Sequence, residues 1–425
     1  MAGYFSKTDF TPSTSNTYTV SFWVKINNFA PTTTNVPYLW SISDSDPSGL
    51  FFQGDTTPNN ITFYRNNGNT RFSPTVYMRD VNAWYHIHLK VSSGTGTLYY
   101  NGESVKTSIT VDAQNYNGGG AEHYIHTYGG GLSSYDNLEC VMSHFHFVDG
   151  TAYDPTVFGS TDATTGEWKI NTAPSVTYGT NGYFILKDGN TGTDHSGNGN
   201  NFTLTGTCTK TEDCPSNVFA TNNSLWKQES SRYLTHTKGN TMISGGGSST
   251  WYQTPATLAF NSGKFYWECK FNAGTNLDKN TAGVIDYEKT QESGQFQDKT
   301  GSVFYKNEDG GETRIDGSTS TADYGTLAQN DILGVAVDMD AATPTVKFYK
   351  NGSLLVTANA SSLSGKFVTP AHMIYTSGEY QVNYGNGYFG DSAVSSAGTN
   401  ASGIGIFEHD CPNGYTALST KGLNE

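Results

Sequence analysis

Two pairs of histidines have the spacing that could bind a metal ion. His86 and His88 form one pair, and His144 and His146 form the other. Side chains alternate along a strand, so each pair would lie on one face of its strand, where two imidazoles can chelate a metal. No third ligand lies within sequence reach, so we favour ordinary strand positions. If the two pairs lay on neighbouring strands, four imidazoles would converge into a metal site or a pH-responsive patch.

A second candidate site is a short run of oxygen-bearing side chains that resembles a calcium-binding loop. Calcium prefers several carboxylate, amide and carbonyl oxygens on a flexible backbone. Asp and Asn also cap turns without any metal, and we favour that role here. Calcium is the one cofactor that the sequence suggests, and its candidate ligands are Asp188, Asn190, Asp194 and Asn198.

Signals for catalysis are missing from the chain. A retaining glucan hydrolase needs two carboxylates across the glycosidic bond, and its E-x-D-x-E signature does not occur. The acidic clusters, Asp44/Asp46 and Glu308/Asp309/Glu312, sit in polar, turn-rich segments and are interpreted as solvated loops. Neither a phosphate-binding G-x-x-x-x-G-K-S/T loop nor a G-x-S-x-G elbow is present. We therefore expect no catalytic residues and no enzyme activity.

Tryptophans could stack against sugar rings if they were exposed. Three of them, Trp23, Trp84 and Trp267, lie within strand patterns, where sheet packing is the favoured role. The remaining candidates are Trp40, Trp168, Trp226 and Trp251.

The composition predicts an all-β protein of two domains. Aromatic residues make up 13% of the chain and charged residues only 15%, with 48 glycines, a balance that favours strands and tight turns over amphipathic helices. A length of 425 residues suits two domains that each bury a core. We expect two consecutive antiparallel β-sandwiches.

Strand patterns in the first half are clear at residues 17–26, 84–91, 97–100 and 141–148. Within W-Y-H-I-H-L-K-V at 84–91, the alternate set beginning with Tyr85 should face the core. Asn101-Gly102 then provides a type I′ hairpin turn. The order of S-F-W-V-K, this strand and L-Y-Y-N-G resembles the laminin G-like, concanavalin-like jelly roll, and the resemblance covers residues 1–206.

The second half repeats the pattern, with strands expected at 264–271, 331–339 and 346–349, the last closed by Asn351-Gly352. The run G-K-F-Y-W-E-x-K-F, followed by D-I-L-G-V-A-V-D-M-D and K-F-Y-K-N-G, resembles the SPRY fold, a β-sandwich that serves as a binding module. We assign residues 230–425 to this domain and residues 207–229 to a polar, turn-rich linker.

The stretch from residue 148 to 223 joins the two halves and resembles a block in tailed-phage virion proteins, particularly those of marine phages. In those proteins a P-x-N-x-F-A-T segment leads from a laminin G-like domain into an SPRY-like one. The corresponding residues here are Pro215, Asn217, Phe219, Ala220 and Thr221. The resemblance implies a non-enzymatic virion surface protein, either a head decoration or knob or a tail-associated fibre protein. Its implied partners are other virion proteins and host-surface glycans.

The net charge, the N-terminal sequence and the cysteines indicate which partners and which surroundings to expect. A net charge of −14 would repel phosphate backbones, so no nucleic acid partner is expected. The N-terminus lacks a secretory signal and no run could span a bilayer, so we expect no membrane insertion. We expect the virion to be assembled in the host cytoplasm. The five cysteines are expected to be mostly reduced and buried, although Cys208 and Cys214 could close a small loop.

Two alternative functions stay open from the sequence. One is a polysaccharide-cleaving glycoside hydrolase with an unrecognised carboxylate pair, and the other is a cellular carbohydrate-binding lectin. A homo-oligomer is expected, because virion sites are symmetric and repeated weak contacts give avidity.

Overall fold

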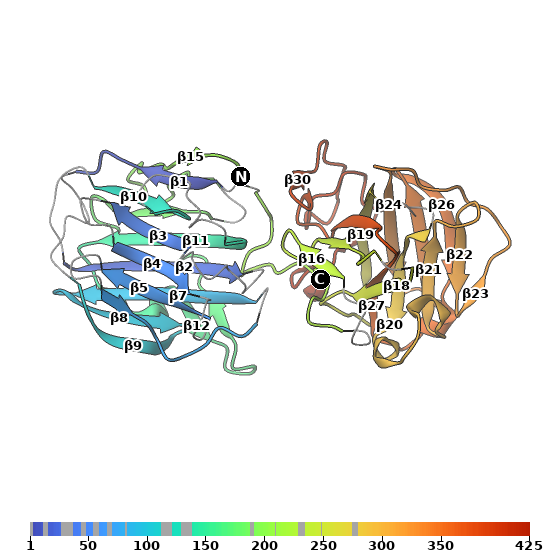
Figure 1. Cartoon of the computed structure of the whole chain (residues 1–425), viewed down its shortest axis with the longest axis horizontal. Helices are drawn as coiled ribbons and strands as arrows, with labels where there is room; N and C mark the ends of the chain where they lie inside the picture. The colour runs from blue at the N-terminus through green and yellow to red at the C-terminus, as the bar shows by residue number, and fades with distance from the viewer. Residues whose placement is uncertain are drawn as a thin grey trace. The chain divides into compact units, whose positions relative to one another are not determined.

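The computed structural model divides the chain into two compact units, which are described separately (Figure 1). The first comprises Met1–Lys210 and Cys214–Ser216, and the second comprises Thr211–Asp213 and Asn217–Glu425. The structure describes residues 3–11, 16–26, 37–43, 48–53, 59–65, 70–80, 83–111, 121–128, 138–187, 191–208, 210–227, 234–247, 249–273 and 279–425.

The first unit is built from two antiparallel sheets and a small hairpin. The seven-stranded sheet has the order β15-β1-β10-β3-β4-β5-β6. Its strands are β1 (Tyr4–Lys7), β3 (Tyr38–Ser43), β4 (Ser48–Gln53), β5 (Asn60–Arg65), β6 (Thr70–Phe72), β10 (Glu122–Ile125) and β15 (Thr203–Thr205). The six-stranded sheet has the order β14-β11-β2-β7-β8-β9. Its strands are β2 (Tyr18–Ile26), β7 (Trp84–Ser92), β8 (Thr95–Tyr100), β9 (Glu103–Thr110), β11 (Cys140–Asp149) and β14 (Tyr183–Ile185).

The core of the first unit lies between these two sheets. Ile87, Leu89 and Val91 of β7 are fully buried there, as the period of two predicts. Aromatic rings from both sheets meet across the core, where Trp40 of β3 lies 6.3 Å from Tyr18 of β2 between ring centroids. The two sheets therefore form a sandwich around one apolar cluster.

The predicted hairpin turn between β8 and β9 is confirmed. Asn101 has φ 47° and Gly102 has φ 82°, the left-handed pair that a type I′ turn requires. Asn351 and Gly352 have the same conformation between two strands of the second unit, with φ 46° and 80°. The Asn-Gly sequence thus determines the backbone conformation of both turns.

The outer face of the six-stranded sheet is covered by the chain that follows β11. This covering segment, residues 150–178, contains η1 (Pro155–Val157) and the hairpin of β12 (Gly159–Thr161) and β13 (Trp168–Ile170). Beneath it, His86 and His88 of β7 are fully buried. Strand alternation directs these histidines away from the core, but the covering segment removes them from solvent.

The second unit is a second sandwich. Its eight-stranded sheet runs β16-β17-β28-β19-β24-β25-β26, with β31 pairing in parallel with β19 and all its other pairs antiparallel. These strands are β16 (Thr235–Thr237), β17 (Met242–Ser244), β19 (Lys264–Ala273), β24 (Ile332–Asp338), β25 (Thr345–Lys350), β26 (Ser353–Asn359), β28 (Glu379–Asn383) and β31 (Thr416–Ala417). The opposite sheet runs β18-β27-β20-β21-β22-β23. Its strands are β18 (Trp251–Pro255), β20 (Thr281–Asp286), β21 (Ser302–Lys306), β22 (Glu312–Ile315), β23 (Ser318–Thr319) and β27 (Val368–Tyr375). A separate hairpin joins β29 (Tyr388–Phe389) to β30 (Ser392–Ala393).

The second core includes residues from before its first strand. Trp267 and Phe348 come from one sheet and Tyr305 from the other, and Ala220 packs into the same cluster. Phe219 forms an isolated bridge with Ser419. Part of the segment expected as a linker, from residue 217 onward, is therefore packed within the second unit.

Helices contribute little to the fold. Within the described residues the helical segments are 3-10 turns, which besides η1 are η3 (Tyr287–Gln291), η4 (Phe296–Asp298), η5 (Ser361–Leu363) and η6 (Gly422–Asn424). None of the helices found in those ranges has the length and apolar character needed to span a membrane. The expected all-β class, with two consecutive sandwiches, is confirmed.

Candidate functional site

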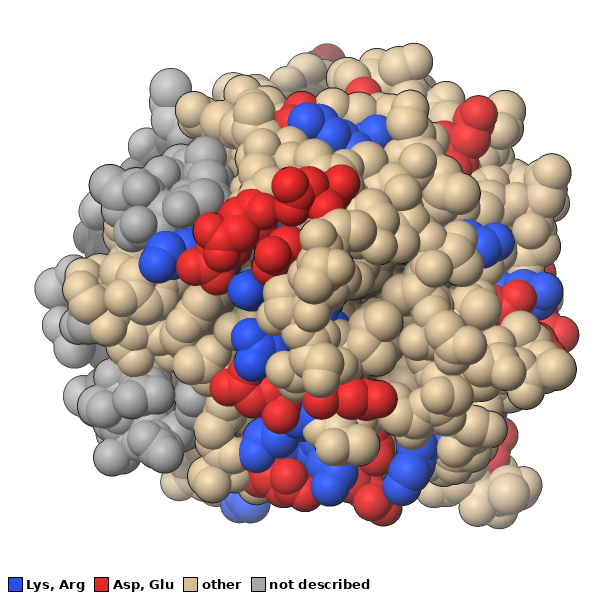
Figure 2. All heavy atoms as spheres, turned by 90° about the vertical axis from the view of Figure 1, so that its right-hand side faces the viewer, with Lys and Arg blue, Asp and Glu red and all other residues tan. Residues whose placement is uncertain are grey.

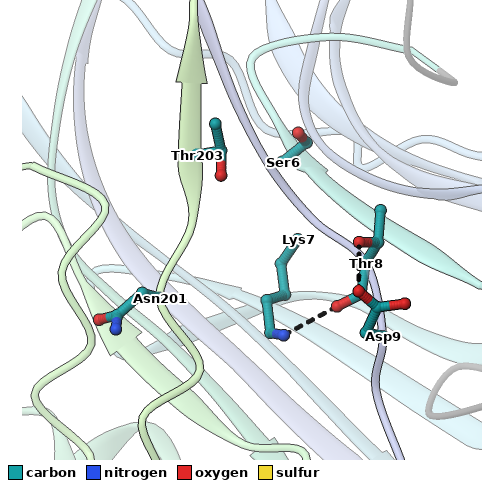
Figure 3. A pocket seen from close by; sticks show the side chains of 6 residues that line it. All are labelled: Ser6, Lys7, Thr8, Asp9, Asn201 and Thr203. Atoms are coloured by element: carbon teal, nitrogen blue, oxygen red, sulfur yellow. Dashed lines mark hydrogen bonds between the residues drawn. The ribbon is translucent and has the colours of Figure 1, made fainter.

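A polar hollow of about 220 Å³ lies at the edge of the seven-stranded sheet, where β1 pairs with the edge strand β15 (Figure 3). Every side chain that lines it is polar. The lining residues are Ser6, Lys7, Thr8, Asp9, Asn201 and Thr203.

The pairing of β1 with β15 brings together residues from the beginning and the end of the first unit's sequence. Ser6 pairs with Thr203 in the antiparallel register, and Asn201 precedes the edge strand. In Figure 3, Asn201 and Thr203 lie on one side of the hollow, across from Thr8 and Asp9. Sequence reasoning missed this site, because no local spacing connects the two segments and β15 is only three residues long.

Internal hydrogen bonds hold the first wall of the hollow. The Lys7 ammonium donates to the Thr8 carbonyl oxygen at 2.8 Å, and the Thr8 hydroxyl donates to Asp9 Oδ2 at 3.2 Å. The Lys7 Nζ atom also lies 5.3 Å from the centroid of the Phe10 ring. Ammonium and hydroxyl donors thus stand beside carboxylate and hydroxyl acceptors, the mixture that binds a polyhydroxylated ligand.

The other wall is anchored by Asp194, one of the proposed calcium ligands. The Asn201 side-chain oxygen accepts a hydrogen bond from the Asp194 N–H at 2.8 Å. Asp194 itself accepts from the N–H groups of Phe184, Ser196 and Asn200 and from the Ser196 hydroxyl, at 2.8 to 2.9 Å. Its two carboxylate oxygens therefore each receive two donors, which is a turn-capping arrangement.

Asn198, the second proposed ligand in the described residues, also binds the turn. Its amide nitrogen donates to the carbonyl oxygens of Gly179 at 2.6 Å and Gly182 at 2.9 Å. Asp188 and Asn190 lie outside the described residues. Within those residues no group of three or more His, Cys, Asp or Glu side chains is placed to hold a metal ion. The described half of the proposed calcium loop supports the capping interpretation.

Three of the four paired histidines converge on the outer face of the six-stranded sheet. Strand β2 lies between β7 and β11, and Ser21 pairs with His88 on one side and with His146 on the other. His86 Nε2 lies 2.8 Å from the Ser21 hydroxyl. His144 is displaced by the register shift between Ser143 and His146. The two pairs are thus not on adjacent strands, yet His86, His88 and His146 form one buried histidine cluster.

Hydrogen bonds from the covering segment hold these imidazoles in place. The Trp168 indole N–H donates to His86 Nδ1 at 3.0 Å, so that nitrogen carries no proton. His88 Nε2 lies 3.0 Å from the Tyr153 carbonyl oxygen and must donate to it. His146 Nδ1 lies 2.8 Å from the hydroxyl of a third covering residue, Tyr178.

Burial lowers the pKa of every member of the histidine cluster. The pKa of His88 falls to about 4, because burial outweighs its bond to the Tyr153 carbonyl and the nearby Asp154. The pKa values of His86 and His146 lie well below the ordinary value, first through burial and then through the neighbouring imidazoles. The cluster is uncharged at neutral pH.

Two acids of the cluster near β22, Glu308 and Glu312, are paired with lysines. Lys306 Nζ lies 3.2 Å from Glu308 and 3.7 Å from Glu312, and Lys279 lies 3.5 Å from Glu308. Figure 2, which faces the second unit, shows acidic and basic side chains in adjoining groups. This pairing supports a structural role for the cluster. Asp44 and Asp46 lie outside the described residues.

Tryptophans are largely packed. Trp23, Trp40 and Trp267 are buried, as expected for the first and the last. The others are half-buried, including Trp84, whose indole lies beneath the Lys25 ammonium at 5.5 Å from the ring centroid. More exposed aromatic rings belong to residues that the sequence analysis did not single out, Tyr77, Tyr287 and Phe367.

Comparison with known proteins finds a family similarity within the first unit. Residues 2–138 match the family model described as the concanavalin A-like lectin/glucanases superfamily. That region contains most strands of both sheets and one wall of the polar hollow. No curated protein sequence matches the chain.

Solved structures that resemble the chain include SPRY domains. The SPRY domain of human HERC1 is 17% identical, with a TM-score of 0.32, and the match covers 38% of this chain and 96% of that domain. The PSpry domain of TRIM65 is also 17% identical, with a TM-score of 0.31 over 39% of this chain and 91% of that one. A human SPRY domain is 14% identical, with a TM-score of 0.28 over 35% and 93% of the two chains.

Proposed function

We propose that this protein is a non-enzymatic surface protein of a bacteriophage virion, and that its first unit binds host-surface glycan in the polar hollow. The observation that supports glycan binding is the lining of that hollow, which is polar throughout and contains a single carboxylate, Asp9. Sugar hydroxyls both donate and accept hydrogen bonds, so they need such a mixed set of partners. Hydrolysis by the usual mechanism needs two carboxylates across the bond.

The virion assignment is supported by the stretch from residue 148 to 223. It includes the covering segment of the first unit and the first packed residues of the second, so the phage-like sequence coincides with parts that both sandwiches need. A head decoration or knob, or a tail-associated fibre protein, would contact other virion proteins through such rigid modules. Several copies on one particle would convert a weak single-site affinity into avidity.

Glycan binding is tested by titrating the full chain with oligosaccharides from bacterial surface polysaccharides. Lys7→Ala removes a charged donor from the hollow and should weaken binding by roughly ten- to a hundredfold, since such a hydrogen bond contributes roughly 1.5–3 kcal/mol. Lys106→Ala on β9, in the opposite sheet, is the matched control and should bind as the wild type does. Equal affinity for all three proteins would contradict the assignment of the hollow.

Virion association and the absence of catalysis need separate measurements. Mass spectrometry of purified particles should find the chain at a fixed copy number, and labelled antibody should locate it on the head or the tail. Incubation with the bound polysaccharide should release no reducing ends. Release that disappears in Asp9→Asn would favour a glycoside hydrolase, whereas saturable glycan binding by a chain absent from particles would favour a cellular lectin.

A further inference from the structure

A thiol and imidazole cluster lies at one end of the seven-stranded sheet, next to the start of β1. Gly3 precedes β1, whose two neighbours in the sheet are β10 and β15. His126 follows β10 directly, and Cys208 lies three residues after β15. Cys140 is the first residue of β11 in the other sheet. The segments that precede β1 and β11 therefore meet at His126, whose ring contacts both Gly3 and Leu138.

Contacts with Gly3 bring these side chains together. His126 Nδ1 lies 3.2 Å from the Gly3 carbonyl oxygen. The Cys208 sulfur is so close to the same residue that a Cβ atom added at Gly3 would lie 2.7 Å from it. Cys140, two residues after Leu138, interacts electrostatically with both His126 and Cys208. Both cysteines pack against the first core while staying partly accessible.

The hydrogen bonds of His126 favour its charged form. Its second ring nitrogen, Nε2, lies 2.9 Å from the Leu138 carbonyl oxygen. Both nitrogens thus face oxygens that can only accept, so both must carry a proton. Burial opposes this charge, but the Cys140 sulfur and the two carbonyls outweigh it and raise the pKa of His126 to about 9. Burial raises the pKa of the Cys208 thiol to about 11, so at neutral pH this thiol reacts through a small fraction of thiolate, the nucleophilic form.

We propose that Cys140 and Cys208 are a redox pair that a low-molecular-weight disulfide converts into an intramolecular bridge. The Cys140 thiolate attacks one sulfur of the small disulfide, forming a mixed disulfide and releasing one thiolate. The Cys208 thiolate then attacks the Cys140 sulfur and releases the second thiolate. Two protein thiols are oxidised, the small disulfide is reduced to two thiols, and these take up the two protons that the cysteines lose.

Such a bridge would tie the start of β11 in one sheet to the segment after β15 in the other. The remaining thiols are poor candidates, because Cys214, Cys269 and Cys411 are buried. All five cysteines are free and three are buried, which agrees with the expectation that they are mostly reduced and buried, and Cys140 and Cys208 are the two that stay partly accessible. The partner of Cys208 in this inference is Cys140, although Cys214 is nearer in sequence. The inference goes beyond the proposed function and does not depend on it.

The test uses the reduced full chain and oxidised glutathione at pH 7.5. After blocking residual thiols, digestion without reductant and mass spectrometry should yield a linked pair of peptides containing Cys140 and Cys208. Cys140 should react at least about tenfold faster than the fully buried Cys269.

Two variants separate the steps of the reaction. In Cys208→Ser the bridge cannot form, so Cys140 should accumulate as a mixed disulfide with glutathione. Cys214→Ser is the matched control and should form the bridge at the wild-type rate. Wild-type protein that carries glutathione on both cysteines without a bridge, that leaves Cys140 unmodified, or that links either cysteine elsewhere would overturn the proposal.

Discussion

Acidification should destabilise the first unit, because three of its histidines are buried in the neutral form. His86, His88 and His146 lie beneath the covering segment, and each has a ring nitrogen bonded to that segment. In the unfolded chain these side chains take up protons near pH 6.5. The folded state resists protonation until about pH 4 at His88, and its neighbours have pKa values shifted in the same direction.

The sign and size of the effect follow from proton linkage. Between the folded and unfolded pKa values the unfolded state binds more protons, so the free energy of unfolding falls as the pH falls. At pH 5 a histidine with an ordinary pKa gains roughly 2 kcal/mol from protonation, which a buried neutral histidine forgoes. Three histidines together should cost about 6 kcal/mol between pH 7 and pH 5, a large share of the roughly 5–15 kcal/mol that stabilises a domain.

His126 acts in the opposite direction but cannot cancel this loss. Its folded pKa of about 9 lies above the unfolded value, so its contribution is fully present below pH 6.5 and is lost as the pH rises toward 9. Between pH 7 and pH 5 it adds only about 1 kcal/mol. Burial raises the pKa of Asp149, which also favours the folded state in acid. The net change for the first unit should remain destabilising by several kcal/mol.

The assay is urea unfolding of the full chain at pH values from 7 to 5, followed by hydrogen exchange in peptides from each unit. Peptides of β7 should lose protection at progressively lower urea as the pH falls. His88→Phe keeps the ring contacts with Phe158 and Tyr99, 5.6 Å away, but removes one titrating group. It should reduce the pH dependence by about a third. A first unit whose stability changes by less than about 1 kcal/mol over this range would refute the reasoning.

Three further substitutions test other parts of the structure. Asp194→Ala removes the acceptor of four hydrogen bonds and should destabilise the first unit by about 2–4 kcal/mol in urea unfolding, with faster exchange in its turn; unchanged stability would argue against the capping role. Gly102 has φ 82°, and Gly102→Ala would place a Cβ atom 2.5 Å from the Trp168 ring. The control is Gly150→Ala, because Gly150 has a similar φ of 78° but no atom within 4 Å of the added Cβ. Gly102→Ala should therefore lower the free energy of unfolding by about 2 kcal/mol more than the control does. Glu268→Gln replaces a buried carboxyl group that accepts hydrogen bonds from the backbone N–H groups of Glu408 and His409. In urea unfolding, the free energy of unfolding of the second unit should fall by about 1–3 kcal/mol. Slower hydrogen exchange around Glu408 and His409 in the variant would contradict this role.

Sequence reasoning was reliable where the signal is local. Alternation along residues 84–91 predicted the core face of β7, and Ile87 is fully buried there. The Asn-Gly pairs predicted turns that need left-handed backbone, and Asn101 adopts it. The aromatic and glycine-rich composition predicted two sandwiches without α-helices, and the family match at residues 2–138 agrees with the concanavalin-like first half.

The sites depend on contacts that no local pattern encodes. Period-two alternation says which side chains leave the core, but it cannot say that residues 150–178 return to cover His86 and His88. The polar hollow exists because β15 pairs with β1, and Cys208 lies beside Gly3 only through the same return of the chain. Composition and turn chemistry thus determined the class of fold. Tertiary structure decided which polar groups are buried together, because the pairing of distant strands follows from the packing of the whole unit.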